Sequence, residues 1–264
     1  MIQETITYTC RSCGSANIIR NGTNQCGNPQ YHCKDCGVYR VLKPKQRHSA
    51  ATRQQVLRAA QERVSLRGIE RIFGVCRQTV AKWIRQWVWQ LPVVVDTLLD
   101  YEVGDVLEAD ELWSFVLNKA RKRWLWLALC RRTRQIVAFY IGQRDAPAAQ
   151  QLWQRVPYPY TLCPIYTDHY APYEEALPTD QHWAKDKNSG ATSHIERWNN
   201  TLRQRLARFV RNTLSFSKSD RMHHIMLEGF IIDYNLRIAS LTNLTTTQFF
   251  GVTITHAARL TGRA

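Results

Sequence analysis

The sequence predicts an α/β domain of roughly 150 residues, preceded by a cysteine-rich module and a small all-α domain. Three observations lead to this fold class. Two Cys-x2-Cys pairs fall within residues 1–41. Apolar residues recur at helical spacing from about residue 52 to residue 90. Beyond residue 104, three apolar runs of strand length are followed by alternating helical and strand patterns.

The composition favours a soluble protein with a polyanionic partner. The chain has 264 residues, is 44% hydrophobic and carries a formal net charge of +15. So sustained a positive field favours nucleic acid over a neutral partner. The sequence contains no run of about 18 apolar residues, so it predicts no membrane span. The N-terminus shows no secretory pattern, which leads us to expect a cytoplasmic protein.

The N-terminal module, residues 1–41, has the pattern of a zinc ribbon. Each cysteine pair can turn both sulfurs toward one ion, and a glycine follows each pair where the chain must bend. Four thiolates in a tetrahedral array suit one structural Zn²⁺. A redox pair or chance cysteines are the alternative, and Cys26 and His32 lie outside the pairs. The expected ligands are Cys10, Cys13, Cys33 and Cys36.

A basic linker, residues 42–52, leads into a predicted helix-turn-helix at residues 53–92. Helices are expected from about Thr52 to Val64, over "LRGIERIF", and from about Arg77, with a tight turn at Gly74. A plain helical bundle with a polar face is the alternative. Outward residues of the third helix could contact bases and phosphates in a major groove: Arg77, Gln78, Thr79, Lys82 and Arg85.

The α/β domain is expected at residues 104–240, after a linker at 93–103. The segments "GDVLEADELWSFVL", "RWLWLALC" and "QIVAFYIG" predict an antiparallel meander. A helix from about Ala146 to Arg155, a short buried strand in "CPIYTDHY" and an arginine-rich helix from Ser193 to Arg211 follow. Residues 241–264 receive no predicted role.

Three carboxylates from separate elements could meet at one divalent ion. Asp110 lies in the middle of the first strand, where alternation places Glu108 on its side and Glu111 on the other. Asp168 ends a different strand, and Glu196 opens the arginine-rich helix. Mg²⁺ takes a few carboxylates plus substrate phosphates. For Glu196 alone, the simpler alternative is a favourable interaction with the helix dipole.

The order Asp110, Asp168, Glu196 resembles the Asp-Asp-Glu triad of transposases and retroviral integrases. "ADELWSFV", "YTDHYAPY" and "SHIERWNNTLRQRLARF" resemble, more closely, transposases of the bacterial insertion-sequence-one type. That family also begins with a zinc finger and a helix-turn-helix. The resemblance implies a ribonuclease H-like catalytic domain with two Mg²⁺ ions, or Mn²⁺, at the triad. It also implies an enzyme of the bacterial cytoplasm that works on DNA as a homodimer or higher oligomer.

The implied reaction hydrolyses one strand at the terminal inverted repeats, frees a 3′-OH and joins it to target DNA by transesterification. Asn199 and Arg203 share the face of Glu196 and resemble family residues that could contact DNA near the scissile phosphate. The opposite, apolar stripe is expected to pack on the sheet. Expected DNA-backbone contacts are Arg197, Arg203, Arg205, Arg208 and Arg211.

Two other functions stay open at this point. One is a DNA-binding regulator with an inactive catalytic domain, and the other is a metal-dependent nuclease that does not transfer strands. The sequence also leaves open whether Glu108, Glu111 or Asp233 supports the metal site.

Overall fold

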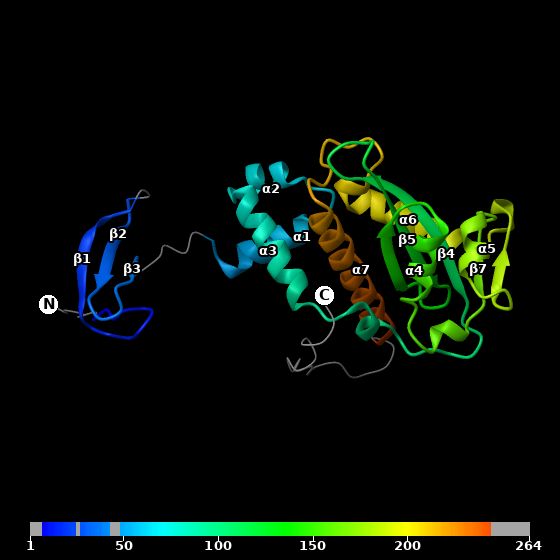
Figure 1. Ribbon diagram of the computed structural model, residues 1–264, viewed down its shortest axis with the longest axis horizontal. Coiled ribbons are helices and arrows are strands. Elements are labelled where there is room, and N and C mark those ends of the chain that lie inside the picture. The colour runs from blue at the N-terminus through cyan, green and yellow to red at the C-terminus, as the bar shows by residue number, and fades with distance from the viewer. Residues whose placement is uncertain (1–6, 25–26, 43–47, 244–264) are drawn as a thin grey trace. The chain divides into compact units, whose positions relative to one another are not determined.

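The computed structural model describes residues 7–24, 27–42 and 48–243, and the chain divides into two compact units, residues 1–51 and 52–264 (Figure 1). Cys26 and nearly all of the segment 241–264 lie outside the described residues. Across the described part of the chain, no helix combines the length and apolar character needed to cross a membrane. The two units are therefore described separately.

The first unit is a small antiparallel sheet of strand order β1-β2-β3. Its strands are β1 (Ile18–Thr23), β2 (Pro29–Cys33) and β3 (Tyr39–Arg40). Ile18 pairs with Cys33, which brings the second cysteine pair beside the start of β1. Among the apolar residues described here, only Cys10 and Cys33 are buried. The sheet therefore has almost no hydrophobic core of its own.

The second unit begins with three short helices, as the sequence predicts. They are α1 (Ala50–Ala59), α2 (Leu66–Phe73) and α3 (Arg77–Gln90). The Ser65 hydroxyl caps α2 by accepting from the Gly68 N–H at 3.0 Å. Gly74 ends α2 in the left-handed conformation, with φ of 64°. The first helix is shorter than predicted, because Arg63 also turns left-handed and its N–H donates to the Arg205 carbonyl.

A five-stranded mixed sheet of order β6-β5-β4-β7-β8 forms the centre of the α/β domain. The predicted meander is present: β4 pairs antiparallel with β5, and β5 with β6. The last two strands run parallel to β4. The strands are β4 (Leu107–Phe115), β5 (Lys122–Cys130), β6 (Ile136–Gly142), β7 (Ile165–Thr167) and β8 (His182–Ala184).

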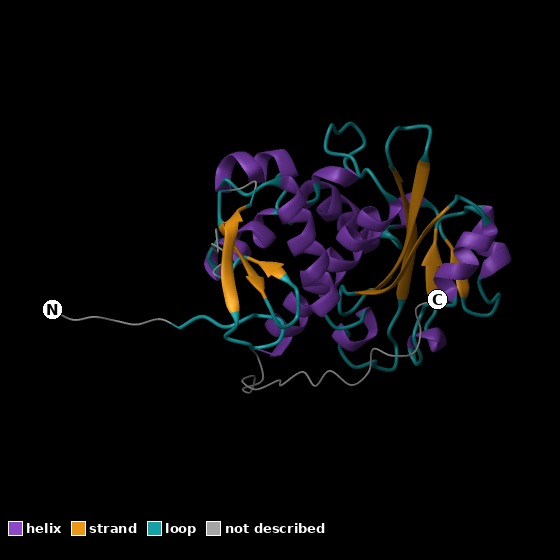
Figure 2. Cartoon of the chain, turned by 60° about the vertical axis from the view of Figure 1, so that its left-hand side comes forward, coloured by secondary structure: helices purple, strands orange, loops and turns teal. Residues whose placement is uncertain are grey.

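Helices cover both faces of this sheet (Figures 1 and 2). Residues of α4 (Ala146–Trp153) and α5 (Ala171–Ala176) pack in one hydrophobic cluster with Trp126 and Ile165. The opposite face is covered by α6 (Ser193–Arg205) and α7 (Asp220–Asn243). Short 3-10 helices complete the chain: η1 (Val94–Thr97), η2 (Tyr160–Leu162), η3 (Lys187–Ser189) and η4 (Ala207–Phe209). The arginine-rich helix thus ends at Arg205, earlier than the sequence predicts.

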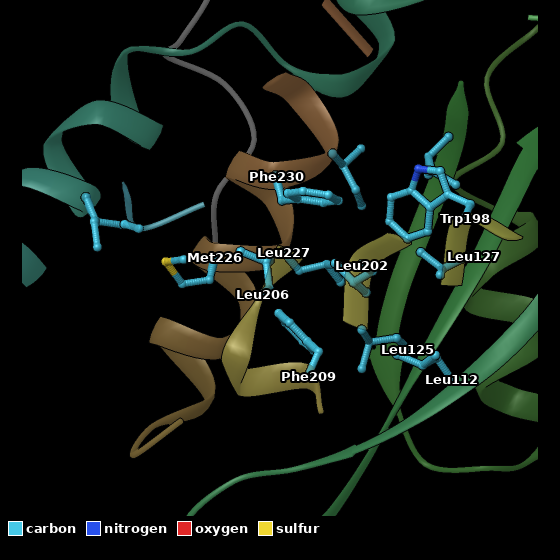
Figure 3. Packing of buried hydrophobic residues seen from close by; sticks show 14 of the residues in the cluster. Leu112, Leu125, Leu127, Trp198, Leu202, Leu206, Phe209, Met226, Leu227 and Phe230 are labelled. Carbon is cyan, nitrogen blue, oxygen red and sulfur yellow. The ribbon is translucent and has the colours of Figure 1, made fainter. Parts of the chain in front are cut away.

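Helix α7 joins the helix-turn-helix to the α/β domain. Its Phe230, Leu227 and Met226 lie in one cluster with Leu202 and Phe209 (Figure 3). The same cluster contains residues of α1, α2 and α3: Val56, Ile69, Val80 and Ile84. A Cβ at Gly229 would lie 2.6 Å from the Val88 side chain, so α3 approaches α7 closely there. Helices α1, α2 and α3 and the α/β domain are therefore packed on a common core.

The segment 93–103, expected to be a linker, is held against the α/β domain. Thr97 is buried; its carbonyl accepts from Gln135 Nε2 at 2.8 Å and its hydroxyl from Asn235 Nδ2 at 3.0 Å. These bonds tie η1 to both β6 and α7. The segment expected as a linker is thus hydrogen-bonded to the α/β domain that follows it.

Candidate metal centre and candidate active site

The four N-terminal cysteines form a ready metal site. The sulfurs of Cys10, Cys13, Cys33 and Cys36 all lie within 4.8 Å of one another. The two closest pairs cross between the knuckles, Cys10 to Cys36 and Cys13 to Cys33, each at 3.6 Å. All four are free thiols. Four sulfurs gathered in this way could hold a metal such as zinc, as the spacing predicts.

The two knuckles are built alike. The Gly14 N–H donates to the Cys10 carbonyl at 2.8 Å, and the Gly37 N–H to the Cys33 carbonyl at 3.0 Å. Both glycines are left-handed, with φ of 76° and 70°. Backbone N–H groups of Cys13 and Ser12 lower the pKa of Cys10 to about 6, which favours the thiolate that a metal binds. His32 instead stacks on Tyr39, with ring centroids 4.2 Å apart.

In the second unit, the carboxylates of β4 separate onto two sides of the sheet. Asp110 faces α6, where its Oδ2 accepts from Asn199 Nδ2 at 2.7 Å. Glu111 faces α4 and α5, accepting from Arg144 Nε at 2.9 Å and from the Tyr173 hydroxyl at 3.1 Å. The carboxylate of Glu111 thus already has hydrogen-bond donors in Arg144 and Tyr173. This alternation matches the sequence prediction. Of the two, Asp110 is the carboxylate that faces the helix carrying Glu196.

Asp110 is half-buried close to two other acidic residues, Glu111 and Asp168. Burial, together with the charges of Glu111 and Asp168, raises the pKa of Asp110 to about 7. The bond from Asn199 offsets only part of this effect. A carboxyl whose pKa is raised in this way by burial and by neighbouring carboxylates is a candidate for a functional site.

Asp168 follows β7 at the level of Asp110. The parallel register pairs Glu108 with Tyr166, and two further residues along each strand are Asp110 and Asp168. Neighbouring strands lie about 4.8 Å apart, which brings the two backbones close. The Asp168 Oδ1 accepts the Tyr170 N–H at 3.2 Å, so the loop after β7 holds the side chain in place.

Glu196 stands in the first turn of α6 and is exposed to solvent. Its Oε1 accepts from the Thr192 hydroxyl at 3.1 Å. Asn199, three residues further, lies on the same face and contacts Asp110. The triad is nevertheless open: in the described part of the chain, only the cysteine cluster brings three or more ligand groups within 4.8 Å of one another.

Two buried polar atoms near Asp110 have no hydrogen-bond partner among the described residues. They are Asn199 Oδ1 and Arg203 Nε. Burial, and then the charge of Arg211, lowers the pKa of Arg203, while the charge of Asp110 acts in the opposite direction. An acceptor and a donor left unsatisfied beside a carboxyl cost free energy unless a ligand pairs with them. The donor set therefore fits a cation and an anionic substrate better than an empty site.

Glu108 is one of three acidic residues whose role the sequence left open. It is fully buried and accepts from the backbone N–H groups of His194 and Ile195, at 2.9 and 3.0 Å. Arg131 Nε also donates to it at 2.7 Å. Glu108 thus caps the N-terminus of α6 and fixes the helix that carries Glu196 and Asn199 onto β4. Strand alternation places Glu108 on the same side of β4 as Asp110, and this was the only feature of the sequence that indicated its role.

Helix α3, the third helix of the predicted helix-turn-helix, presents a basic and polar face. On α3, Arg77, Gln78, Lys82 and Arg85 are exposed, and Thr79 is half-buried with its hydroxyl 3.1 Å from Cys76 Sγ. Arg77 forms an ion pair with Glu70 at 2.9 Å. A cleft beside this face is lined by residues of α1, α3 and α7: Arg53, Arg85, Gln86, Trp89, Gln90 and Arg221.

The five arginines that follow Glu196 do not form a single surface. Arg197 and Arg211 are exposed, and Arg203 lies half-buried beside the triad. Arg205 instead forms an ion pair with Glu62 and lies over the Phe230 ring at 5.1 Å. Burial lowers the pKa of Arg208 to about 10, and its Nη1 contacts the Ser217 hydroxyl. Arg205 and Arg208 thus both have internal partners, and their expected contact with the DNA backbone stays a prediction.

Comparison with known proteins identifies relatives of the α/β domain. The family model of the IS1 transposase matches residues 105–236, a range that includes all three carboxylates. The insertion element iso-IS1n protein InsB of Shigella dysenteriae is 34% identical over 126 residues, which cover 48% of this chain and 93% of that protein. The insertion element IS1 protein InsB of Shigella flexneri is 37% identical over 124 residues, covering 47% and 92%.

Proposed function

This chain belongs to the IS1 transposase family, and we propose that it cuts and joins DNA at an Asp-Asp-Glu site formed by Asp110, Asp168 and Glu196. The observation that carries the proposal is the bond between Asn199 Nδ2 and Asp110 Oδ2. It joins the helix of Glu196 to the strand of Asp110, at the level where Asp168 ends β7. We propose that these three carboxylates, which come from three separate elements, bind their metal together.

The sheet order supports a ribonuclease H-like fold for the proposed catalytic domain. Three antiparallel strands in chain order are extended by two parallel strands on the side of β4. In such mixed sheets, sites form at the carboxyl ends of the parallel strands. Asp168 occupies that position on β7, and the central strand β4 supplies Asp110.

The proposed site would hold two Mg²⁺ or Mn²⁺ ions on its three carboxylates. Such ions, when bound, activate an attacking oxygen and neutralise charge on the phosphate. Asp110 supports this assignment because burial and the charges of Glu111 and Asp168 raise its pKa to about 7, and a bound cation would stabilise its ionised form. Asn199 Oδ1 and Arg203 Nε, which lack partners in the described chain, would orient the DNA strand at the scissile phosphate.

The reaction proposed is cleavage at the terminal inverted repeats to leave a 3′-OH, followed by transesterification into target DNA. Both steps displace an oxygen at phosphorus and need no covalent intermediate with the protein. Glu108 would act indirectly by holding α6, because its carboxylate is already bonded to His194, Ile195 and Arg131. Pairing two transposon ends would require a homodimer or a larger assembly.

DNA recognition would be divided between the two groups of basic residues. The exposed Gln78, Lys82 and Arg85 of α3 suit base-edge contacts. Arg197 and Arg211, also exposed, suit phosphate contacts on the catalytic side. The zinc ribbon and the residues that follow it add further positive charge for the backbone of the same DNA.

The test uses DNA that flanks the gene, where the inverted repeats of the element would lie. We expect the full chain with Mg²⁺ to cut at the repeat and to join the freed 3′ end to a second duplex. Asp110→Asn and Glu196→Gln should each abolish both steps while DNA affinity stays close to that of the unaltered chain. The matched controls Asp180→Asn and Glu175→Gln change exposed carboxylates and should leave both steps intact.

The outcomes separate the rival functions. Cutting without joined products would make the protein a metal-dependent nuclease. Tight binding to the repeat with neither cutting nor joining would make it a DNA-binding regulator. Wild-type joining by the Asp110→Asn variant would remove that residue from the site.

A further inference from the structure

Two neighbouring loops project from the α/β domain beyond the end of β4. One is the β4–β5 turn, residues 116–121, and the other is residues 210–219, between η4 and α7 (Figures 1 and 2). We refer to these two loops as the two-loop tip. Leu214 has 98% of its surface exposed, the highest value among the large apolar residues described, and Leu117 has 44%.

The tip is braced where the two loops meet. The Leu117 N–H donates to the Ser217 carbonyl at 2.9 Å, and Lys119 Nζ donates to Asn212 Oδ1 at 2.8 Å. Phe216 packs against Phe115 of β4, with ring centroids 5.7 Å apart. These contacts join residues about a hundred positions apart, so the loops form one structural feature.

The base of the tip is anchored in the protein interior. The Ser217 hydroxyl lies 2.9 Å from Nδ1 of His223, a fully buried residue of α7. Arg123 Nε donates to Asp220 Oδ1 at 2.7 Å, which ties β5 to the start of α7. The tip is therefore held at its base by an ion pair and by a buried hydrogen bond.

Leu214 is directed outward by a local turn. The Thr213 hydroxyl accepts the Ser215 N–H at 2.9 Å, which closes the chain on either side of the leucine. A single exposed apolar residue is ordinary on a protein surface and implies nothing alone. Here the leucine lies between two braced residues, Asn212, which bonds to Lys119, and Phe216, which packs on Phe115.

The surroundings of the leucine are strongly basic. Residues 116–123 and 207–221 together carry eight Lys or Arg and one acidic residue, Asp220. Asp220 is neutralised by Arg121 and Arg123. The exposed cations of these two segments are Lys119, Lys122, Arg211 and Lys218. An exposed apolar side chain on a basic feature is complementary to a duplex, whose phosphates flank an apolar stack of bases.

The tip lies in line with the proposed site. Val116 is six residues beyond Asp110 along β4, and a strand rises about 3.3 Å per residue, which gives about 20 Å. Arg211 of the tip is also close enough to Arg203 to affect its pKa. A duplex rises about 3.4 Å per base pair, so DNA held at the triad would pass the tip about six base pairs away.

From this arrangement we propose that Leu214 is a wedge that inserts between base pairs of the bound duplex and unstacks them. Leucine is among the side chains that kink DNA in this way, and the surrounding cations would hold the phosphates on either side. The inference rests on the proposed function, because it takes the duplex to be the one held at Asp110, Asp168 and Glu196. It assigns a role to a residue that takes no part in the chemistry.

The experiment measures unstacking with 2-aminopurine, a base whose fluorescence rises when it leaves the stack. The full chain is bound, without added Mg²⁺, to duplexes that carry the probe at successive positions across a full helical turn. We expect a rise confined to one or two adjacent positions. Leu214→Ser should abolish the rise and weaken binding by about tenfold, which corresponds to about 1.4 kcal/mol. Leu214→Met should retain both.

The control and the contrary outcomes are distinct. Leu162→Ser alters another exposed leucine, with 53% of its surface accessible, and should change neither signal. Fluorescence that is equal in Leu214→Ser and the unaltered chain, or flat at every position, would overturn the wedge. A Leu214→Ser chain that lost self-association in sedimentation but kept the DNA signal would make the tip a contact between copies and would also overturn it.

Failure of the wedge and failure of the proposed function remain separable. Glu196→Gln should lose joining yet keep the fluorescence rise. A chain that joins DNA without Leu214-dependent unstacking retains the proposed function and loses the wedge. A chain that unstacks DNA at Leu214 but never cuts or joins retains the wedge and loses the proposed function.

Discussion

The two compact units organise their candidate metal-binding residues in opposite ways. In the first unit, Cys10 and Cys33 are candidate metal ligands and also the buried apolar residues of the described chain there. In the second unit, Asp110, Asp168 and Glu196 sit on a scaffold built by two extensive hydrophobic clusters. The first unit would therefore depend on its metal to fold, whereas the second would depend on its metal for chemistry alone.

Zinc removal should produce the largest effect and should be confined to the first unit. Zinc binding contributes an apparent free energy of about 10–16 kcal/mol to the folding of small zinc modules. The first unit has almost no hydrophobic core that could stabilise it without the metal. We expect a chelator, or Cys33→Ser, to unfold residues 7–42 while the thermal transition of the second unit stays unchanged. Amide NMR spectra and elemental analysis, which should find about one zinc per chain, provide the measurement.

A matched cysteine sharpens that test. Cys76 is exposed at the start of α3 and lies outside the cluster, so Cys76→Ser should leave zinc content and both units intact. A ribbon that kept its amide spectrum without metal would remove the contrast between the two units.

The sequence predicts the first unit better than the helices that enclose the second. The knuckles are local, because cysteine and glycine spacing alone determines them. Alternation along β4 likewise separates Asp110 from Glu111 correctly. Helix α7 escapes prediction because it contacts α3, η1 and β6, which leaves no single apolar face in its pattern. Without α7, the packing of the helix-turn-helix on the α/β domain cannot be foreseen.

Residue roles that depend on distant partners are also invisible in the sequence. Arg205 bonds to Glu62, 143 positions away, and Glu108 bonds to His194, 86 positions away. Residue type suggests that an arginine binds phosphate and that a strand glutamate binds metal. Only the tertiary fold shows that each already has an internal partner. The triad could be proposed from its order along the chain, whereas the support beneath it could not.

The next largest effect concerns the charge of Asp110 in the absence of metal. Its pKa is about 7 in the folded chain and about 4 when unfolded. Folding therefore takes up a proton between these pH values, so the free energy of unfolding should fall as pH rises from about 4 to about 7. Three pKa units correspond to at most about 4 kcal/mol. Denaturant unfolding of the second unit across this range measures the slope.

Asp110→Asn isolates this contribution. The variant keeps an oxygen for Asn199 but cannot ionise, so its second unit should be more stable than the unaltered chain at pH 7.5 without metal. Added Mg²⁺ should stabilise the unaltered chain and leave the variant unchanged, since bound cations favour the carboxylate. Equal Mg²⁺ stabilisation of both proteins would place the metal elsewhere in the chain.

A smaller loss is expected when the support beneath α6 is weakened. Glu108→Gln keeps one carbonyl oxygen but removes the charge and one acceptor from His194 and Ile195. We expect about 1–3 kcal/mol of destabilisation. A shift of Glu196 by about 1 Å would slow cleavage by about a hundredfold. Single-turnover cleavage and thermal unfolding measure these effects, with Glu175→Gln as the exposed control. Unchanged cleavage in Glu108→Gln would show that the cap does not position α6.

The smallest effects separate the reading of bases from the binding of phosphates. Gln78 and Arg85 of α3 are exposed and carry groups that match base edges, whereas Arg197 of α6 is exposed on the catalytic side. Gln78→Ala or Arg85→Ala should weaken binding to the inverted repeat by about 1–3 kcal/mol and reduce the preference over scrambled DNA. Arg197→Ala should weaken binding to both sequences equally and lower the salt dependence by about one phosphate contact.

These variants belong in the full chain, because α1, α2 and α3 share their hydrophobic cluster with α7 and α6. An isolated helix-turn-helix would lose that packing and could not report on recognition. Competition between repeat and scrambled duplexes at several salt concentrations gives both the specificity ratio and the salt slope. If Arg197→Ala blurred the sequence preference and Gln78→Ala did not, recognition would move to α6. Base recognition would then be assigned to α6, the helix that also carries Glu196.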